Sequence, residues 1–176
     1  MTATITRRVH DEPKPRPVSA AGFEVVLHSG RARAARAIPG EGRLCVVVAD
    51  SGSFAGAPVA TDLPLPVPSS STVVWCRAGG AIQVRASWAP PALLVRADRT
   101  VMIPETPGLP GVAVLEPGER LLVLSSSAFE AAPRGVVRLL HATPARLLGA
   151  DPADLLDALF REAPEAGGAV ITRRGA

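Results

Sequence analysis

Short apolar runs separated by turn residues make up most of the chain between residues 23 and 130. The clearest run is Leu44–Ala49, which is apolar on both faces and therefore predicts a central strand. The stretch Ala81–Trp88 alternates instead, which predicts a strand with one buried face. The side chains expected on that face are Ile82, Val84, Ala86 and Trp88. Gly79-Gly80 and Asp98-Arg99 stand between such runs and predict hairpin turns, so the pattern indicates antiparallel sheet.

The pattern becomes helical after Glu130. Val136–His141 and Pro144–Leu148 predict two short amphipathic helices. A third helix is expected to begin at Asp151, because an aspartate followed by proline is a strong helix start, and to end before Pro164. Its apolar stripe consists of Leu155, Leu156, Leu159 and Phe160.

Residues 1–21 predict a flexible, proline-rich N-terminal tail. Asp11–Pro17 alternates proline with charged residues, which excludes a helix and a central strand. The folded domain is therefore expected over residues 22–176, with its first strand at Phe23.

Composition narrows the class of protein. The chain has 176 residues, of which 47% are hydrophobic, enough for one globular domain. It has no apolar run of about 18 residues, so no membrane span is expected, and without a leader-like start the cytoplasm is the expected location. A net charge of +3 and 3% aromatic residues argue against nucleic-acid binding. Cys45 and Cys76 lie in apolar runs and are expected to be buried, reduced thiols.

The stretch from Leu115 to Glu130 organises the rest of the chain. It contains a turn at Pro117-Gly118, a buried strand at Leu121–Leu124 and a polar corner at Ser125–Ser127. A strand that ends in small polar residues places them at the rim of a sheet, where binding and catalytic sites are often built.

This stretch resembles the late strand of PPM-type (metal-dependent, protein phosphatase 2C) domains of the bacterial SpoIIE-type branch. In that family the strand ends in Thr-Asp-Gly, whose aspartate binds the catalytic metals; here Ser126 stands at the aspartate and Ser127 at the glycine. The strand that ends at Asp50 resembles a second family signature, and Asp50 matches its metal-binding aspartate. Where the family carries further acids upstream, this chain carries Arg31, Arg33 and Arg36.

The resemblance implies an α+β fold: a PPM-phosphatase-like β-sandwich with C-terminal helices on one face. The pair of helices on the other face is expected to be largely deleted, because residues 57–68 contain four prolines. The family reaction needs manganese or magnesium held by several carboxylates, and Asp50 is the one ligand carried over. We therefore expect no catalytic residue, no bound metal and no cofactor.

The function implied is that of a pseudophosphatase: a catalytically inactive, regulatory protein-binding module in partner-switching signalling. The alternative is an active or weakly active metal-dependent serine/threonine phosphatase. The partner is expected to be a protein, in one version a phosphoprotein bound by Arg31, Arg33, Arg36, Ser125, Ser126 and Ser127. An uncovered sheet face would also favour a homodimer or a docked partner.

Overall fold

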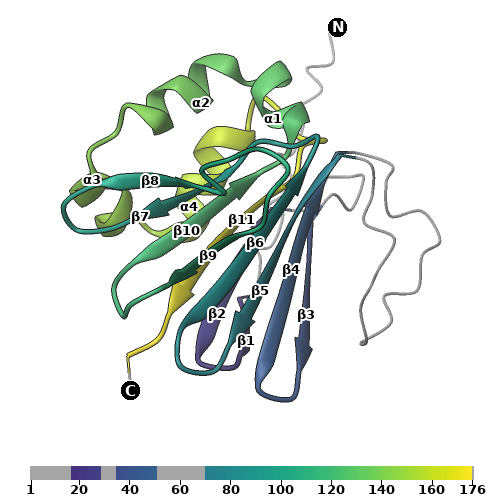
Figure 1. The fold of residues 1–176 in the computed structure, drawn as a ribbon. Helices are drawn as coiled ribbons and strands as arrows, with labels where there is room; N and C mark the ends of the chain where they lie inside the picture. Colours follow the sequence, from purple (N-terminus) through teal and green to yellow (C-terminus); the bar gives the residue numbers. More distant parts are fainter. Residues whose placement is uncertain (1–16, 29–34, 51–69, 176) are drawn as a thin grey trace, which may run out of the picture.

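The computed structural model describes residues 17–28, 35–50 and 70–175 (Figure 1). Two antiparallel sheets pack face to face, and four helices follow the tenth strand. The predicted α+β sandwich with C-terminal helices is confirmed.

The first sheet has six strands. In spatial order they are β1 (Val18–Ala20), β2 (Phe23–His28), β11 (Gly168–Arg173), β10 (Arg120–Leu124), β7 (Ala92–Val95) and β8 (Thr100–Ile103). The second sheet has five: β3 (Ala35–Gly40), β4 (Arg43–Ala49), β5 (Ser71–Arg77), β6 (Ala81–Ser87) and β9 (Gly111–Val114). The predicted Gly79-Gly80 turn joins β5 to β6, and the predicted Asp98-Arg99 turn joins β7 to β8.

The helices cover the outer face of the six-stranded sheet. They are α1 (Ser126–Ala131), α2 (Pro133–Leu140), α3 (Pro144–Gly149) and α4 (Pro152–Phe160). As predicted, Asp151 caps α4, because its carboxylate accepts hydrogen bonds from the backbone N–H groups of Ala153 and Asp154.

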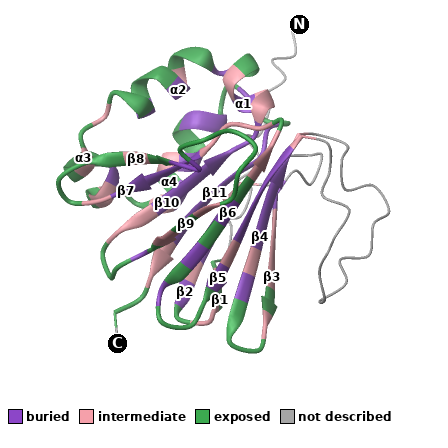
Figure 2. Cartoon of the chain, in the orientation of Figure 1, coloured by how far each residue is buried: buried purple, intermediate pink, exposed green. Residues whose placement is uncertain are grey.

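Two apolar layers hold these elements together. Side chains from both sheets form the inner layer, which contains Val46, Val74 and Leu121. The outer layer lies between the helices and the six-stranded sheet, and contains Leu122 and Phe160. The central strands of the six-stranded sheet are therefore buried on both faces (Figure 2), which explains the unbroken apolar run Leu121–Leu124.

Neither face of the five-stranded sheet packs against helices α1–α4. The strand residues in the helix-packed apolar layer all belong to the six-stranded sheet, which agrees with the predicted reduction in helical content. Residues 57–68, where a helical layer was predicted to be replaced, lie outside the described residues. The outward side chains of Val47, Ala49 and Val73 are nevertheless buried in a small third cluster.

Two local predictions need correction. The predicted tail extended to residue 21, but Val18–Ala20 forms β1 and pairs with β2, so the sheet begins earlier; residues 1–16 lie outside the described residues. Trp88 was predicted on the buried face of its strand, but it is 91% exposed. The strand ends at Ser87, and Trp88 turns the chain with a φ of 48°, which carries its ring away from the sheet.

The two cysteines lie on opposite faces of the five-stranded sheet. Cys76 faces the core, whereas Cys45 is half-buried on the outer face, so the prediction of two buried thiols holds fully only for Cys76. Burial raises the pKa of Cys45 to about 11, although Arg43 acts in the opposite direction. Burial, with a smaller effect of Cys45, raises the pKa of Cys76 to about 12.

We expect both thiols to react slowly with iodoacetamide at neutral pH, because little thiolate is present there. The Cys45 reaction should become faster as the pH approaches 11 and should stay ahead of the Cys76 reaction. Mass spectrometry of protein labelled with and without urea measures both rates. Rapid labelling of Cys76 in the native protein at neutral pH would contradict the burial described here.

Replacing Gly168 by alanine tests the contact between the six-stranded sheet and α4. A Cβ atom at this position would lie 2.5 Å from the ring of Phe160, which is itself stacked on His28 with the ring centroids 4.4 Å apart. The ring has little room to move, so Gly168→Ala should lower the free energy of unfolding by about 1–3 kcal/mol. Urea denaturation measures this change.

Gly149→Ala is the matched control, because a Cβ atom there meets no atom within 4 Å. It should leave stability unchanged or raise it slightly. Equal effects of the two substitutions would show that the Gly168 contact is not tight.

Candidate functional site

The site lies at the rim of the sandwich, where β4 ends beside the start of α1. Asp50 follows β4 directly, and its two carboxylate oxygens have different partners. Oδ1 accepts a hydrogen bond of 2.8 Å from the backbone N–H of Ser127, and Oδ2 accepts one of 2.5 Å from the hydroxyl of Ser70. Asp50 thus caps a helix that belongs to another part of the chain, since Ser127 lies in the first turn of α1.

The hydroxyls of Ser70 and Ser126 complete the hydrogen-bonded group around Asp50. The Ser70 hydroxyl has one proton and three acceptors within reach: Asp50, the carbonyl of Trp88 at 2.9 Å and the hydroxyl oxygen of Ser126 at 3.2 Å. The charged and nearest acceptor is Asp50, so Ser70 donates there. Ser126 Oγ lies 3.3 Å from the same Trp88 carbonyl and can donate to it. The hydroxyl protons of Ser70 and Ser126 then both have acceptors, and the Trp88 carbonyl lies within hydrogen-bond distance of both serines.

We call Asp50, Ser70, Ser126, Ser127 and the Trp88 carbonyl the Asp50 cluster. It joins four segments that are distant in sequence and connects the end of the five-stranded sheet to α1. Sequence reasoning identified Asp50, Ser126 and Ser127 but missed Ser70 and the Trp88 carbonyl. Ser70 could have been found, because an antiparallel partner of β4 must start where β4 ends.

Ser125 has a separate, structural role. Its side chain is 1% exposed, and its hydroxyl accepts a hydrogen bond from the backbone N–H of Gly167. Its own N–H donates to the Gly167 carbonyl, which extends the pairing of β10 with β11 by one residue. Ser125 is therefore a buried residue that stabilises the end of the β10–β11 pairing, and it is not an exposed binding group. Its Oγ lies 2.9 Å from that of Ser127.

Of the predicted arginines, the structure describes Arg36, which does not lie beside these serines. Arg31 and Arg33 lie outside the described residues. Arg36 pairs with Val47 in the sheet register and so shares the outer face of the five-stranded sheet with it. The described part of the predicted binding set thus lies on two surfaces, the rim and the outer sheet face.

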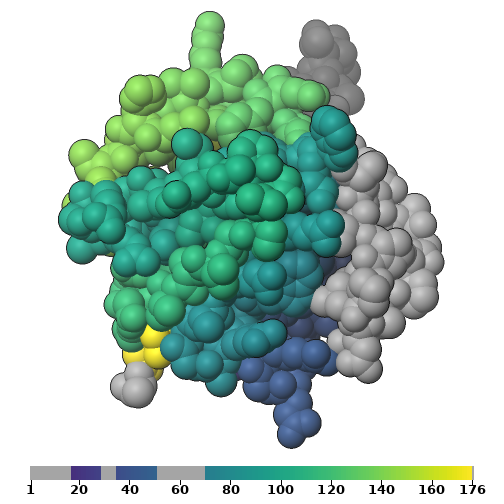
Figure 3. Space-filling model, in the orientation of Figure 1, coloured from purple at the N-terminus to yellow at the C-terminus, as the bar shows by residue number. Residues whose placement is uncertain are grey.

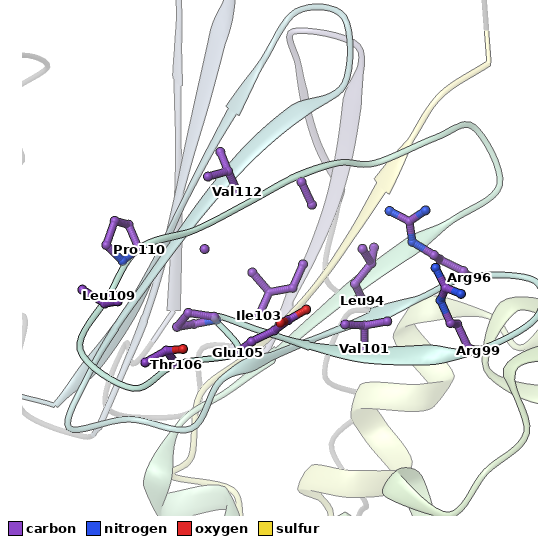
Figure 4. A pocket seen from close by; sticks show the side chains of 13 residues that line it. Leu94, Arg96, Arg99, Val101, Ile103, Glu105, Thr106, Leu109, Pro110 and Val112 are labelled. Carbon is purple, nitrogen blue, oxygen red and sulfur yellow. The ribbon is translucent and has the colours of Figure 1, made fainter.

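One cavity reaches the rim at Ser126, and a second shares Pro104 and Glu105 with it. The first, of about 930 Å³, is lined by Ser126, the exposed Trp88 and Met102, and several prolines. The second, of about 670 Å³, opens between the edge strands β8 and β9 (Figure 4). Arg96 at its border is already engaged, with the Val114 carbonyl at 3.4 Å and the Glu119 carboxylate at 3.7 Å.

The Asp50 cluster does not fit a pair of divalent metal ions. It has one carboxylate, and hydroxyl, amide and carbonyl groups supply the rest of its polar atoms. Two bridged dications need several anionic oxygens to offset their charge. Across the described residues, no three His, Cys, Asp or Glu side chains converge where they could hold a metal.

Solved structures with a similar fold include phosphatase domains. The phosphatase domain of the cell fate determinant SpoIIE from Bacillus subtilis superposes with a TM-score of 0.53, over 88% of this chain and 95% of that one, at 12% sequence identity. A Mycobacterium tuberculosis chain with RsbU and RsbW domains gives a TM-score of 0.50 at 19% identity, over 87% of this chain and 60% of that one. No family model and no curated protein matches the sequence.

The chain has the PPM-type phosphatase fold. The predicted resemblance is thereby confirmed at the level of the fold. In the predicted alignment Asp50 and Ser126 stand at metal-ligand positions of this fold, and the structure brings both into one cluster, through Ser70. No helix in the described part of this PPM-fold domain has the length and apolar character needed to cross a membrane.

Asp50→Ala should lower the free energy of unfolding by about 1–3 kcal/mol, because the Ser127 N–H would lose its acceptor. Asp50→Asn should cost less, since the amide oxygen can still accept that bond and Ser70 can accept from the amide. Urea denaturation of both variants, with Asp157→Ala on the exposed face of α4 as control, measures the order. If Asp50→Ala proved stabilising, Asp50 would be a strained functional group and not a structural one.

Proposed function

We propose that this PPM-fold domain is a pseudophosphatase that regulates signalling by binding a protein partner. The observation that carries the proposal is the commitment of both Asp50 oxygens to hydrogen bonds within the protein. A metal at this position would have to displace the Ser70 hydroxyl and the Ser127 N–H. It would gain one negative charge in return.

The Asp50 cluster supplies no group for phosphate hydrolysis without metals. The hydroxyls of Ser70 and Ser126 have carboxylate or carbonyl acceptors, and the Ser127 hydroxyl lies 2.9 Å from that of Ser125. Among the described residues, none of these hydrogen bonds connects a serine to a histidine that could act as a base. Activation of water in the PPM fold would have to come from bound metal, for which the described residues have no adequate donor set.

The rim offers a surface for a protein partner beside the Asp50 cluster. Trp88 is 91% exposed and Met102 58% exposed, and both line the 930 Å³ cavity that reaches Ser126. Exposed aromatic and methionine side chains of this kind are enriched where proteins bind proteins. Partner-switching regulation fits this proposal, and SpoIIE, one of the structural neighbours, is described as a cell fate determinant.

Metal titration separates the proposal from its alternative, an active metal-dependent serine/threonine phosphatase. We expect isothermal titration calorimetry to show no manganese binding at micromolar concentration. A phosphoserine peptide incubated with manganese and the protein should release no phosphate above the background without protein.

Ser126→Asp provides a matched test of the missing ligand. It restores the carboxylate that the family carries at this position, so it should raise manganese affinity above that of the parent protein. Micromolar manganese binding by the parent, or phosphate release that Asp50→Asn abolishes, would establish the phosphatase instead.

A further inference from the structure

All ionisable side chains in the strands of the five-stranded sheet are arginines, apart from the two cysteine thiols. They are Arg36, Arg43, Arg77 and Arg85. None of its five strands contains an aspartate or a glutamate. An entirely cationic sheet is unusual in a chain whose acidic and basic residues are nearly balanced, 16 against 19.

The register places all four arginines on the outer face. Val46 and Val74 face the core, so their neighbours along each strand point outward. Arg43 is directly opposite Arg77, and Arg85 is opposite Val73, which belongs to the outer cluster. Arg36 was placed on this face above. We call this surface the arginine face.

Part of the arginine face is hollowed and accessible. A groove of about 820 Å³ is lined by Arg43, Arg77 and Arg85 together with Trp75 and Gln83. Arg77 and Arg85 are exposed, and neither forms an ion pair or side-chain hydrogen bond with the described residues. The groove lies near the turns that join β3 to β4 and β5 to β6, at the opposite end of the molecule from α1 and α2 (Figures 1 and 3).

The register brings two positive charges together. Arg43 lies directly opposite Arg77 on the neighbouring strand, and like charges in this position repel. The one acid that lines the groove, Glu41 in the β3–β4 turn, offsets one of three positive charges. A partner that brings carboxylates to Arg77 and Arg85 would remove this repulsion and form charge-assisted hydrogen bonds.

We propose that the arginine face binds an acidic segment of a protein partner, with Trp75 as the apolar contact at its centre. The inference rests on the proposed function, since it specifies the chemistry of the partner. A second copy of this chain fits poorly, because it would bring arginine against arginine. Single-stranded nucleic acid also fits poorly, since Trp75 is the single aromatic residue in these five strands and successive bases need several stacking platforms.

Fluorescence can report binding at this face directly. The chain has two tryptophans, so Trp88→Phe leaves Trp75 as the sole reporter. The probe is an amphipathic peptide of glutamate and leucine, and its control has glutamine in place of glutamate. We expect the glutamate peptide to shift Trp75 emission to the blue, to bind more weakly as salt is added, and to bind far more tightly than the glutamine peptide.

Charge reversal then localises the contact. R77E/R85E in the same background should weaken peptide binding by about tenfold or more. R134E/R146E changes the net charge equally at exposed positions on α2 and α3, and should leave binding unchanged. R77Q/R85Q, which introduces no new charge, should give an intermediate loss and guards against misfolding of the reversed variant.

Three results would overturn the proposal: equal peptide affinity for R77E/R85E and the parent, equal affinity for the two peptides, or tighter binding of single-stranded RNA than of the glutamate peptide. These outcomes are independent of the metal titration. If the domain hydrolysed phosphopeptides, it could still bind an acidic peptide through the arginine face. If it had no phosphatase activity, it could still fail to bind that peptide.

Discussion

The structure depends on the hydrogen bonds that the Asp50 carboxylate accepts. At the rim, the end of β4, the start of β5, the turn after β6 and the start of α1 come together. A half-buried carboxylate at such a junction must find donors or destabilise the fold. Here the donors are a helix N–H and a serine hydroxyl of the protein itself. The same two bonds that stabilise the junction occupy the oxygens that a metal would need, and the proposal of a pseudophosphatase rests on this double role.

Unequal covering of the two sheets explains where the charges lie. The six-stranded sheet packs against the other sheet on one side and against α1–α4 on the other, so its central strands are apolar throughout. The five-stranded sheet has one such partner among the described elements. Its inner side chains are apolar, while its outer face combines a small buried cluster with four arginines. A surface of this composition is suited to an acidic partner, because buried apolar contact and charge pairing are both available there.

Sequence reasoning succeeded where a residue's environment depends on near neighbours in the chain. The Asp151 cap, the Gly79-Gly80 turn and the doubly apolar strand at Leu44–Ala49 follow from local rules and are present. It failed at Trp88, since strand alternation cannot reveal that the strand ends one residue earlier. It also missed β1, because Val18–Ala20 is too short to show a period and forms a strand by pairing with β2. Ser70 was missed for a related reason: its role exists through contacts with residues 20 and 56 positions away.

By itself the sequence determined the class of fold, the positions of most of its strands and of α2–α4, and the scarcity of carboxylates at the positions that the predicted alignment assigns to metal ligands. These properties follow from hydrophobic period, turn chemistry and residue identity, which are local. Only the tertiary structure decided what Asp50 does and where the arginines point. Both depend on which strands become neighbours and in what register, and a shift by one residue would turn every arginine of a strand to the opposite face. Such pairings are set by the packing of the whole sandwich, which no single stretch of the chain contains.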